Sequence, residues 1–273
     1  MHKLTKYLLL LRLSVTHPFE FLDRMEIPWQ ARKQRRYRKT LASPTYLKAY
    51  GMEEGVKVLS SVVGRDLMTI LGERDLRDIQ LHVAQSTRDL EKVTNLPFPI
   101  IFNADPTLAQ LCYVLCRALE PETVLETGVA YGVTSATILA ALHTNQKGTL
   151  HSIDLPPIGD RAGTYIGVMV PNEYRSRWHL HRGSSKRVMP RLFANGVGQI
   201  DLFLHDSAAV YTLEKRELET VWPHLAPHGA IIVGNIGHNA VFAEFVKENH
   251  IDHWFVIEQK AKKGDLTGVV LRV

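Results

Sequence analysis

The residues Thr123-Val124-Leu125-Glu126-Thr127-Gly128-Val129-Ala130-Tyr131-Gly132 decide the fold. A short apolar run, typical of a buried strand, leads into a loop with two glycines and then into the helical pattern Ser135–His143. Glycine permits a tight strand-to-helix turn and lets a ligand approach the backbone closely. The spacing of the two glycines differs from Gly-x-Gly-x-x-Gly, so a dinucleotide pyrophosphate is a poor fit.

The same alternation of short apolar runs and helical stretches continues toward the C-terminus. The apolar runs are Thr123–Val129, Thr149–Leu155, Trp178–Gly183, Ile200–His205 and Ala230–Val233. The helical stretches between and after them are Ser135–His143, Lys186–Ala194, Leu213–Leu225 and Asn239–Asn249. Continuous apolar strands separated by helices predict a parallel sheet that is covered on both faces.

The last two predicted strands, Trp254–Ile257 and Gly268–Val273, are joined by a short polar link. Such a link cannot hold a crossover helix, so this pair is predicted to be antiparallel. We therefore expect an α/β fold with a Rossmann-like, doubly wound, mostly parallel seven-stranded sheet and a final antiparallel strand. The predicted domains are 96–273 for this fold and 1–95 for a basic, mostly helical N-terminal extension.

The N-terminal arm carries the positive charge of the chain. Residues 1–48 hold 11 Lys and Arg against three Asp and Glu, a surplus of eight, so the other 225 residues of this +5 chain sum to −3. The apolar run 7–11 is far shorter than the roughly 20 residues that span a bilayer, and no small-residue cleavage site follows it. We expect a cytoplasmic protein.

Three partners fit the basic arm, whose cations are Lys3, Lys6, Arg12 and the cluster Arg32–Lys39. It can pack on its own domain or on a second subunit of a homo-oligomer, which is the favoured interpretation. It can also hold the protein peripherally on an anionic membrane surface. Nucleic acid is the least favoured partner, because the body of the chain is net negative.

Three further strands end in polar residues. The second strand ends at Asp154, the third in Gly183-Ser184-Ser185-Lys186, and the fourth in His205-Asp206-Ser207. Ligands of open α/β sheets bind outside the carboxyl ends of the strands, where an acidic residue at the second strand can accept hydrogen bonds from ribose hydroxyls. Four strand ends with suitable chemistry predict one nucleoside-binding site.

Residues from about 100 to 273 resemble the class I S-adenosylmethionine-dependent methyltransferases. The similarity is greatest to small-molecule O-methyltransferases of the catechol and caffeoyl-coenzyme A type and their bacterial relatives. Val124–Gly128 matches the first motif of that family, and Gly183–Pro190 matches its adenine-contact segment. Ile200–Ser207 and Trp222–Asn235 match the regions of its fourth and fifth strands.

The resemblance implies S-adenosylmethionine as the cofactor and assigns its methionine end to five positions. Glu126 and Thr134 would bind that end, and the backbone of Gly128 and Ala130 would line it. Asp206 would lie below the sulfonium.

The resemblance also assigns the adenosine half of the cofactor. Asp154 would take the ribose hydroxyls. Leu155, Ser184 and Ser185 would surround the adenine.

The match to the family weakens at the reacting end. Catechol-type enzymes hold Mg²⁺ with oxygen ligands, and the matching positions here are Asp206, Gly234 and Asn235, of which Gly234 offers no side-chain ligand. Asp206 and Asn235 remain as ligands of Mg²⁺ or another divalent metal, and the metal stays open. The proton-abstracting lysine of the family aligns with Ala209. His238 is the candidate base, because imidazole is a competent general base at neutral pH, so the predicted catalytic residues are Asp206 and His238.

These residues predict an O-methyltransferase that acts on a hydroxylated small molecule, either a sugar or a secondary metabolite. Gly234 and Ala209 motivate an alternative, a protein that binds the cofactor but has lost methyl transfer and serves a binding or structural role. A nucleic-acid methyltransferase is disfavoured, because Asp206-Ser207-Ala208-Ala209 lacks the Asp/Asn-Pro-Pro-aromatic motif of base amino-methylation.

Overall fold

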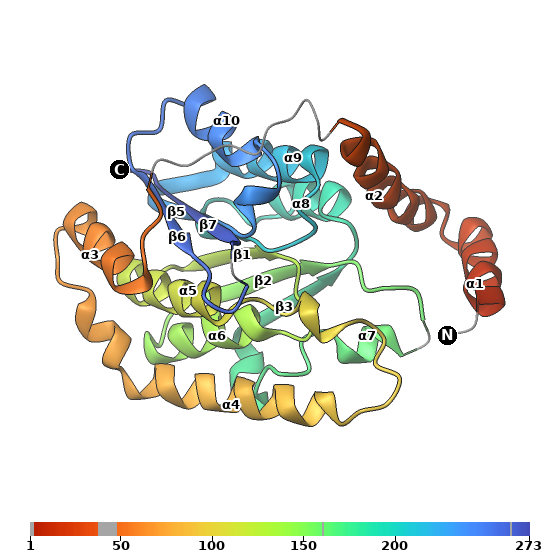
Figure 1. The fold of residues 1–273 in the computed structure, drawn as a ribbon, viewed down its shortest axis with the longest axis horizontal. Helices are drawn as coiled ribbons and strands as arrows, with labels where there is room; N and C mark the ends of the chain where they lie inside the picture. The colour runs from red at the N-terminus through yellow and green to blue at the C-terminus, as the bar shows by residue number, and fades with distance from the viewer. Residues whose placement is uncertain (1–2, 38–47, 160, 263) are drawn as a thin grey trace.

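The computed structural model describes residues 3–37, 48–159, 161–262 and 264–273. Its centre is a seven-stranded sheet with the order β3-β2-β1-β4-β5-β7-β6 (Figure 1). The strands are β1 (Thr123–Thr127), β2 (Thr149–Asp154), β3 (Trp178–Arg182), β4 (Ile200–His205), β5 (Leu225–Val233), β6 (Trp254–Glu258) and β7 (Leu266–Leu271). Strands β1 to β5 pair in parallel, and β7 runs antiparallel to both β5 and β6. The predicted sheet with its antiparallel strand is confirmed; β5 begins five residues earlier than expected.

Helices cover both faces of the sheet. In chain order they are α1 (Lys3–Thr16), α2 (Pro18–Tyr37), α3 (Met52–Val63), α4 (Arg74–Glu91), α5 (Pro106–Leu119), α6 (Val133–Thr144), α7 (Ala162–Tyr165), α8 (Ser185–Ala194), α9 (Tyr211–Val221) and α10 (Val241–Glu248). Alternate residues of each strand face opposite sides, so Val124 packs with α5 and α6, and its neighbour Leu125 packs with the side of α8 to α10. Both layers are apolar, which accounts for the continuous apolar strands.

Part of the predicted extension belongs to the main core. Val56 and Leu59 of α3 and Leu76 and Ile79 of α4 are buried in the same cluster as α5 and α6. The isolated residue Tyr50 also pairs with Ile257 of β6. The predicted division at residue 95 stays a prediction, although the helices on either side of it share one core.

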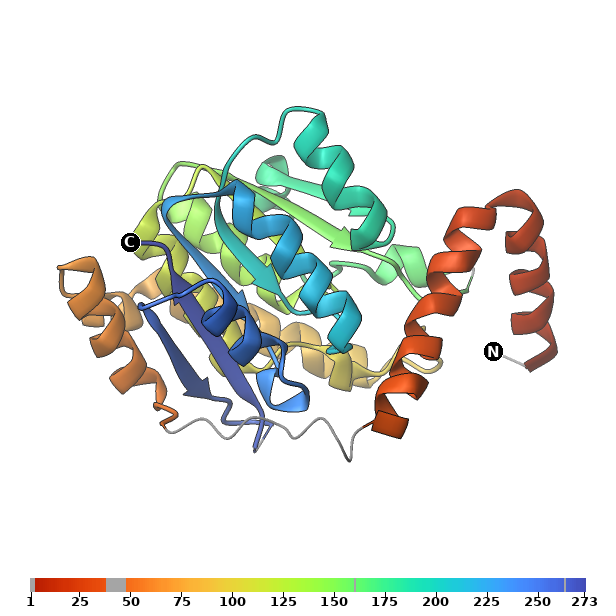
Figure 2. The ribbon, with the colours of Figure 1, turned by 90° about the horizontal axis from the view of Figure 1, so that it is seen from above.

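The first two helices form a hairpin at the side of the molecule. α2 lies against the body and α1 lies beyond it (Figure 2). Of the predicted basic cluster, residues 38 and 39 lie outside the described residues, as do the side chains of residues 3, 6, 35, 36 and 37. None of the described helices has the length and apolar character needed to cross a bilayer.

Candidate cofactor and acceptor site

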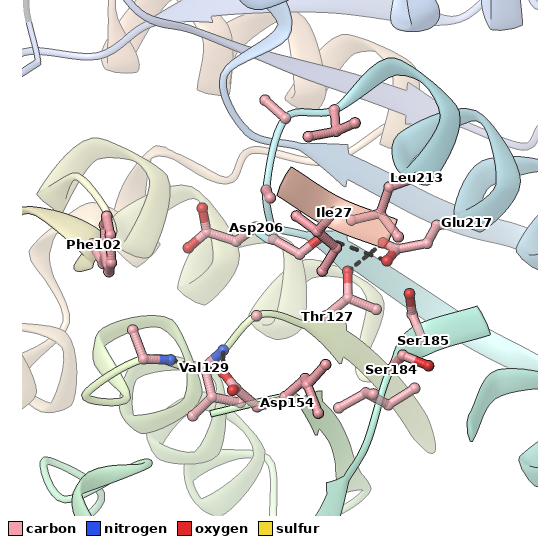
Figure 3. A pocket seen from close by; sticks show the side chains of 18 of the residues that line it. Ile27, Phe102, Thr127, Val129, Asp154, Ser184, Ser185, Asp206, Leu213 and Glu217 are labelled. Atoms are coloured by element: carbon pink, nitrogen blue, oxygen red, sulfur yellow. Dashed lines mark hydrogen bonds between the residues drawn. The ribbon is translucent and has the colours of Figure 1, made fainter. Parts of the chain in front are cut away.

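A cavity of about 800 Å³ opens at the carboxyl ends of β1, β2, β4 and β5 (Figure 3). Besides these strand ends, its walls come from α2, from the short helix η2 (Ile100–Phe102) and from the link between β6 and β7. This volume lies at the upper end of the range for small-molecule sites. It therefore offers room for a nucleoside ligand and a second small molecule together.

The loop after β1 is shaped by two glycines in the left-handed region. Gly128 has φ 84°, and a Cβ there would lie 2.3 Å from the backbone oxygen of Asp206. Gly132 has φ 96°, and a Cβ there would lie 2.7 Å from Cα of Gly167. Because both positions combine positive φ with close backbone contact, glycine is required at each.

Asp154, at the end of β2, holds this loop and faces the cavity. One carboxylate oxygen, Oδ2, accepts hydrogen bonds from the backbone N–H groups of Val129 (2.8 Å) and Ala130 (3.1 Å). Burial raises the pKa of Asp154, although the two N–H groups oppose the shift. Within the described residues the other oxygen, Oδ1, has no hydrogen-bond partner, so it can accept hydrogen bonds from a ligand.

The predicted adenine side also lies in the cavity. Leu155, Ser184 and Ser185 all line it, close to Asp154. The hydroxyl of Ser184 donates to Asp23 of α2 over 2.6 Å, and Arg187 pairs with the same carboxylate at 2.7 Å. The helix α2 is thus bound to the third strand end and closes one side of the cavity.

The structure does not bring Glu126 and Thr134 into the cavity. Glu126 lies on the α5 and α6 side of the sheet and is fully buried. Its carboxylate accepts hydrogen bonds from the hydroxyls of Thr134 (2.5 Å), Ser135 (2.6 Å) and Ser152 (2.6 Å). Burial raises its pKa against these hydrogen bonds. The side chains of Glu126 and Thr134 therefore support the loop from below, and contact with the methionine end stays a prediction.

Asp206, which follows β4, forms the floor of the acceptor side. It is half-buried, and the burial of its carboxylate together with the charge of Glu126 raises its pKa to about 7. Lys262 opposes this shift with its positive charge, and its Nζ donates to the backbone oxygen of Asn103 over 2.9 Å. Lys262 lines the cavity and was missed from the sequence, where it reads as part of a turn.

The predicted base His238 lines the same side of the cavity. It lies in the short helix η5 (Ile236–His238), which follows Asn235 in the left-handed region at φ 58°. Its Nε2 lies 3.1 Å from Oδ1 of Asp265, a second residue of the β6–β7 link. A carboxylate at this distance can hold an imidazole ring in one orientation, as in other acid–base pairs.

A buried ionic network lies at the floor of the cavity, which Thr127 and Glu217 line. His205 Nδ1 lies 2.7 Å from Oε2 of Glu217, which also accepts the hydroxyl of Thr127 at 2.6 Å (Figure 3). Glu214 is buried nearby and accepts a hydrogen bond from Asn239. Burial opposes the charge of His205, but the two glutamates prevail and raise its pKa to about 9. Burial likewise opposes the charge of Glu217, yet His205 holds its pKa below the ordinary value.

The donor set at the predicted metal position does not fit a divalent ion. Asp206 and Asn235 line the cavity, but position 234 supplies no side-chain oxygen, and the charge of Lys262 already acts on Asp206. No group of three or more His, Cys, Asp or Glu side chains in the described ranges could hold a metal ion. Asp206 and Asn235 are therefore not assigned a metal ion.

Gly234→Asp is expected to create the missing metal site. A Cβ at this position would lie 3.2 Å from Oδ1 of Asp206, so the new carboxylate would stand beside the existing one. Two carboxylates that share a cation should raise Mn²⁺ affinity by about tenfold or more. Calorimetric titration with Mn²⁺ measures this, with Gly234→Asn as the control of equal size and no added charge. Equal affinities of the two variants would contradict the expectation.

This chain is similar to known proteins in two ways: part of its sequence matches a family model, and its fold matches solved structures. The family model described as "Methyltransferase domain" matches residues 125–236. No curated protein matches the chain. Solved structures with the same fold share little sequence identity, so their similarity concerns the fold alone.

Three of these structures are O-methyltransferases by description. The O-methyltransferase from Bacillus cereus, solved with S-adenosylhomocysteine, is 12% identical with a TM-score of 0.53, over 81% of this chain and 98% of that one. A second structure is the O-methyltransferase TomG from Streptomyces achromogenes, which is involved in tomaymycin synthesis and was solved with S-adenosylmethionine. It is 14% identical with a TM-score of 0.54, and the match covers 81% of this chain and 97% of that one. A putative caffeoyl-CoA O-methyltransferase from Staphylococcus aureus is 15% identical with a TM-score of 0.51, over 72% and 98%. The resemblance to class I methyltransferases is thus confirmed, since residues 125–236 match a methyltransferase domain and the chain has the fold of S-adenosylmethionine-dependent O-methyltransferases.

Proposed function

We propose that this protein is an S-adenosylmethionine-dependent O-methyltransferase that acts on a hydroxylated small molecule. The observation that carries the proposal is one cavity that holds two kinds of chemistry. Asp154, whose Oδ1 has no hydrogen-bond partner in the described part of the chain, lies with Ser184 at one end. An imidazole–carboxylate pair, His238 and Asp265, lines the same cavity with Asp206.

The residues at the nucleoside end suit S-adenosylmethionine, which supplies an electrophilic methyl group when it is bound. Asp154 would accept both ribose hydroxyls through its free oxygen. Leu155 and Ser184 would border the adenine. Asp206 would face the sulfonium, whose positive charge favours the ionised form of a carboxylate with a pKa of about 7.

The acceptor end combines an apolar rim with polar groups below it. Phe98, Ile101 and Phe102 line the cavity on the η2 side. This rim favours an acceptor with an apolar or aromatic body, so a secondary metabolite suits the site better than a sugar does.

His238 would remove the proton of the acceptor hydroxyl, with Asp265 orienting its ring and stabilising the imidazolium. The freed oxygen can then attack the methyl carbon in line with the carbon–sulfur bond, which breaks to leave a neutral thioether. The ammonium group of Lys262 would stabilise the developing negative charge on the acceptor oxygen. His238 and Lys262 would together take the place of the proton-abstracting lysine of the family, whose position is Ala209 in this chain.

The alternative of a cofactor-binding protein without methyl transfer gains no support from this cavity. Its acceptor side carries an imidazole, two carboxylates and an ammonium group, whereas a purely structural site has no need of them.

Turnover with methyl-labelled S-adenosylmethionine tests the proposal. The purified chain is incubated with catechols, phenols, hydroxy acids and a cell metabolite extract, with and without Mg²⁺. Labelled product that needs the intact His238 supports it. If the protein binds the cofactor but forms no product with any pool, the alternative of a cofactor-binding protein without methyl transfer would be favoured.

His238→Gln is expected to lower kcat by about a hundredfold to ten-thousandfold, since it removes the general base. The dissociation constant of S-adenosylhomocysteine should stay within about twofold, because the nucleoside end is untouched. The measurement is a steady-state rate with any acceptor found above. His253→Gln serves as the matched control, as this exposed histidine lies at the opposite end of β6. An equal rate for both variants would remove His238 from the mechanism.

A further inference from the structure

The hairpin of α1 and α2 exposes an unusual amount of apolar surface. Eight large apolar side chains in its described part are exposed, from Met25 at 47% to Val15 at 78%. We call this set the arm face, and its members are Tyr7, Leu8, Leu11, Val15, Phe19, Leu22, Met25 and Trp29. Leu22, Met25 and Trp29 recur at spacings of three and four, so they share one side of α2. Apolar surface of this extent on a soluble domain marks a contact with a partner.

The acidic side chains of α2 turn away from solvent and toward the body. Glu20 lies 3.7 Å from Arg182 of β3, and Asp23 pairs with Arg187 at 2.7 Å. Glu26 contacts both Lys186 (2.8 Å) and Arg216 (3.1 Å), and these cations lower its pKa against the effect of burial.

The exposed charges of the hairpin are all positive. In its described side chains, Tyr7 to Gln34, the exposed charged residues are Arg12, Arg32 and Lys33. Lys33 Nζ also lies 5.6 Å from the ring centre of Trp29. The outward surface of the hairpin therefore combines leucines, a phenylalanine and a tryptophan with cations. The carboxylates of the hairpin instead pair with cations of the body.

We propose that the arm face binds the surface of an anionic lipid bilayer. Helices that lie in the plane of a membrane bury an apolar side with Trp, Phe and Leu, and they place Lys and Arg beside anionic headgroups. A symmetric contact between two copies would instead bring the same cations together, which is unfavourable. The opposite side of α2 lines the cavity with Asp23, Ile27 and Gln30, so one helix would join the lipid surface to the site.

Sedimentation of the full chain with lipid vesicles tests this. Vesicles of phosphatidylcholine alone are compared with vesicles that hold about one third phosphatidylglycerol. We expect binding to the anionic vesicles that weakens with added salt and is much weaker on neutral ones. Each surface cation strengthens such binding about fivefold, so the loss of three cations and the gain of three carboxylates in Arg12→Glu/Arg32→Glu/Lys33→Glu should weaken binding by about a hundredfold or more.

Matched variants separate the arm face from general effects. Lys57→Glu/Arg77→Glu/Arg88→Glu makes the same charge change on exposed residues of α3 and α4 and should bind like the wild type. Leu22→Glu/Trp29→Glu should lose binding, whereas Leu81→Glu, an exposed apolar residue of α4, should not. Circular dichroism confirms that each variant is folded.

Three results would overturn the proposal. The wild type could fail to bind anionic vesicles, or the arm variants could bind as tightly as the α3–α4 controls. The third is a concentration-dependent dimer in lipid-free solution that Leu22→Glu/Trp29→Glu abolishes, which would assign the arm face to a second copy of the chain.

Discussion

Asp154→Ala is expected to weaken the binding of S-adenosylmethionine and S-adenosylhomocysteine by about a hundredfold or more. One oxygen of the carboxylate accepts from the loop after β1, and the other has no hydrogen-bond partner among the described residues and can accept from the ribose hydroxyls. Hydrogen bonds to a charged group each contribute about 1.5–3 kcal/mol, and 1.4 kcal/mol corresponds to a tenfold change in affinity. Isothermal titration of both ligands measures the effect. Asp206→Asn should weaken both ligands far less.

Asp201→Ala is the matched control for this variant. Asp201 lies in β4 and accepts hydrogen bonds from the backbone N–H groups of Glu122 (2.8 Å) and Thr123 (2.9 Å), just as Asp154 accepts two at the other edge of the sheet. It lies outside the cavity, so its removal should cost stability but leave ligand affinity unchanged. Equal losses of affinity in the two variants would mean that the nucleoside lies elsewhere.

Glu217→Ala is expected to lower the free energy of unfolding by about 3–5 kcal/mol, because it leaves His205 buried without its closest carboxylate. Both side chains are almost completely excluded from solvent. Chemical denaturation followed by circular dichroism measures the loss. The double variant His205→Leu/Glu217→Leu should lose less than the single variant, since apolar pairs of similar volume can replace a buried ion pair. A larger loss in the double variant would contradict this account.

The same pair sets a pH window for stability. His205 has a raised pKa in the folded state, so its contribution is complete below its unfolded pKa and disappears as pH rises through about 9. Glu217 has a lowered pKa, so its contribution disappears as pH falls toward and below its ordinary range. The stability difference between wild type and Glu217→Ala should therefore be largest between these limits and shrink above pH 9.

The strands, the antiparallel end of the sheet and the edge that holds the cavity could be predicted from the sequence because they depend on local patterns. Apolar runs of four to seven residues mark the strands, and polar residues at the ends of these runs mark the edge where ligands bind. Asp105 followed by Pro106 is likewise typical of the start of a helix. In the structure the carboxylate of Asp105 accepts a hydrogen bond from the backbone N–H of Thr107 at the start of α5.

The contacts that tertiary structure alone creates could not be predicted in this way. Glu126 finds hydroxyl partners on α6 and β2, and no spacing in the sequence links these residues. Glu214 and Glu217 lie in an amphipathic helix, where glutamates usually face water, and their burial follows from the position of His205. The pattern of residues 18–37 also gave no sign that α2 would form a wall of the cavity.

The antiparallel strand β7 determines where the link between β6 and β7 lies relative to the cavity. Because β7 runs against its neighbours, the link after β6 begins at the edge that holds the loops after β1 and β2, and it brings Lys262 and Asp265 there. The side-chain hydrogen bonds that the described residues of this link make with elements other than β6 and β7 go to Asn103, Asp105, Thr107 and His238, which lie outside the loops after β1 and β2. Mutations in this short link can therefore alter the polar part of the proposed acceptor end while the proposed nucleoside end keeps its own residues.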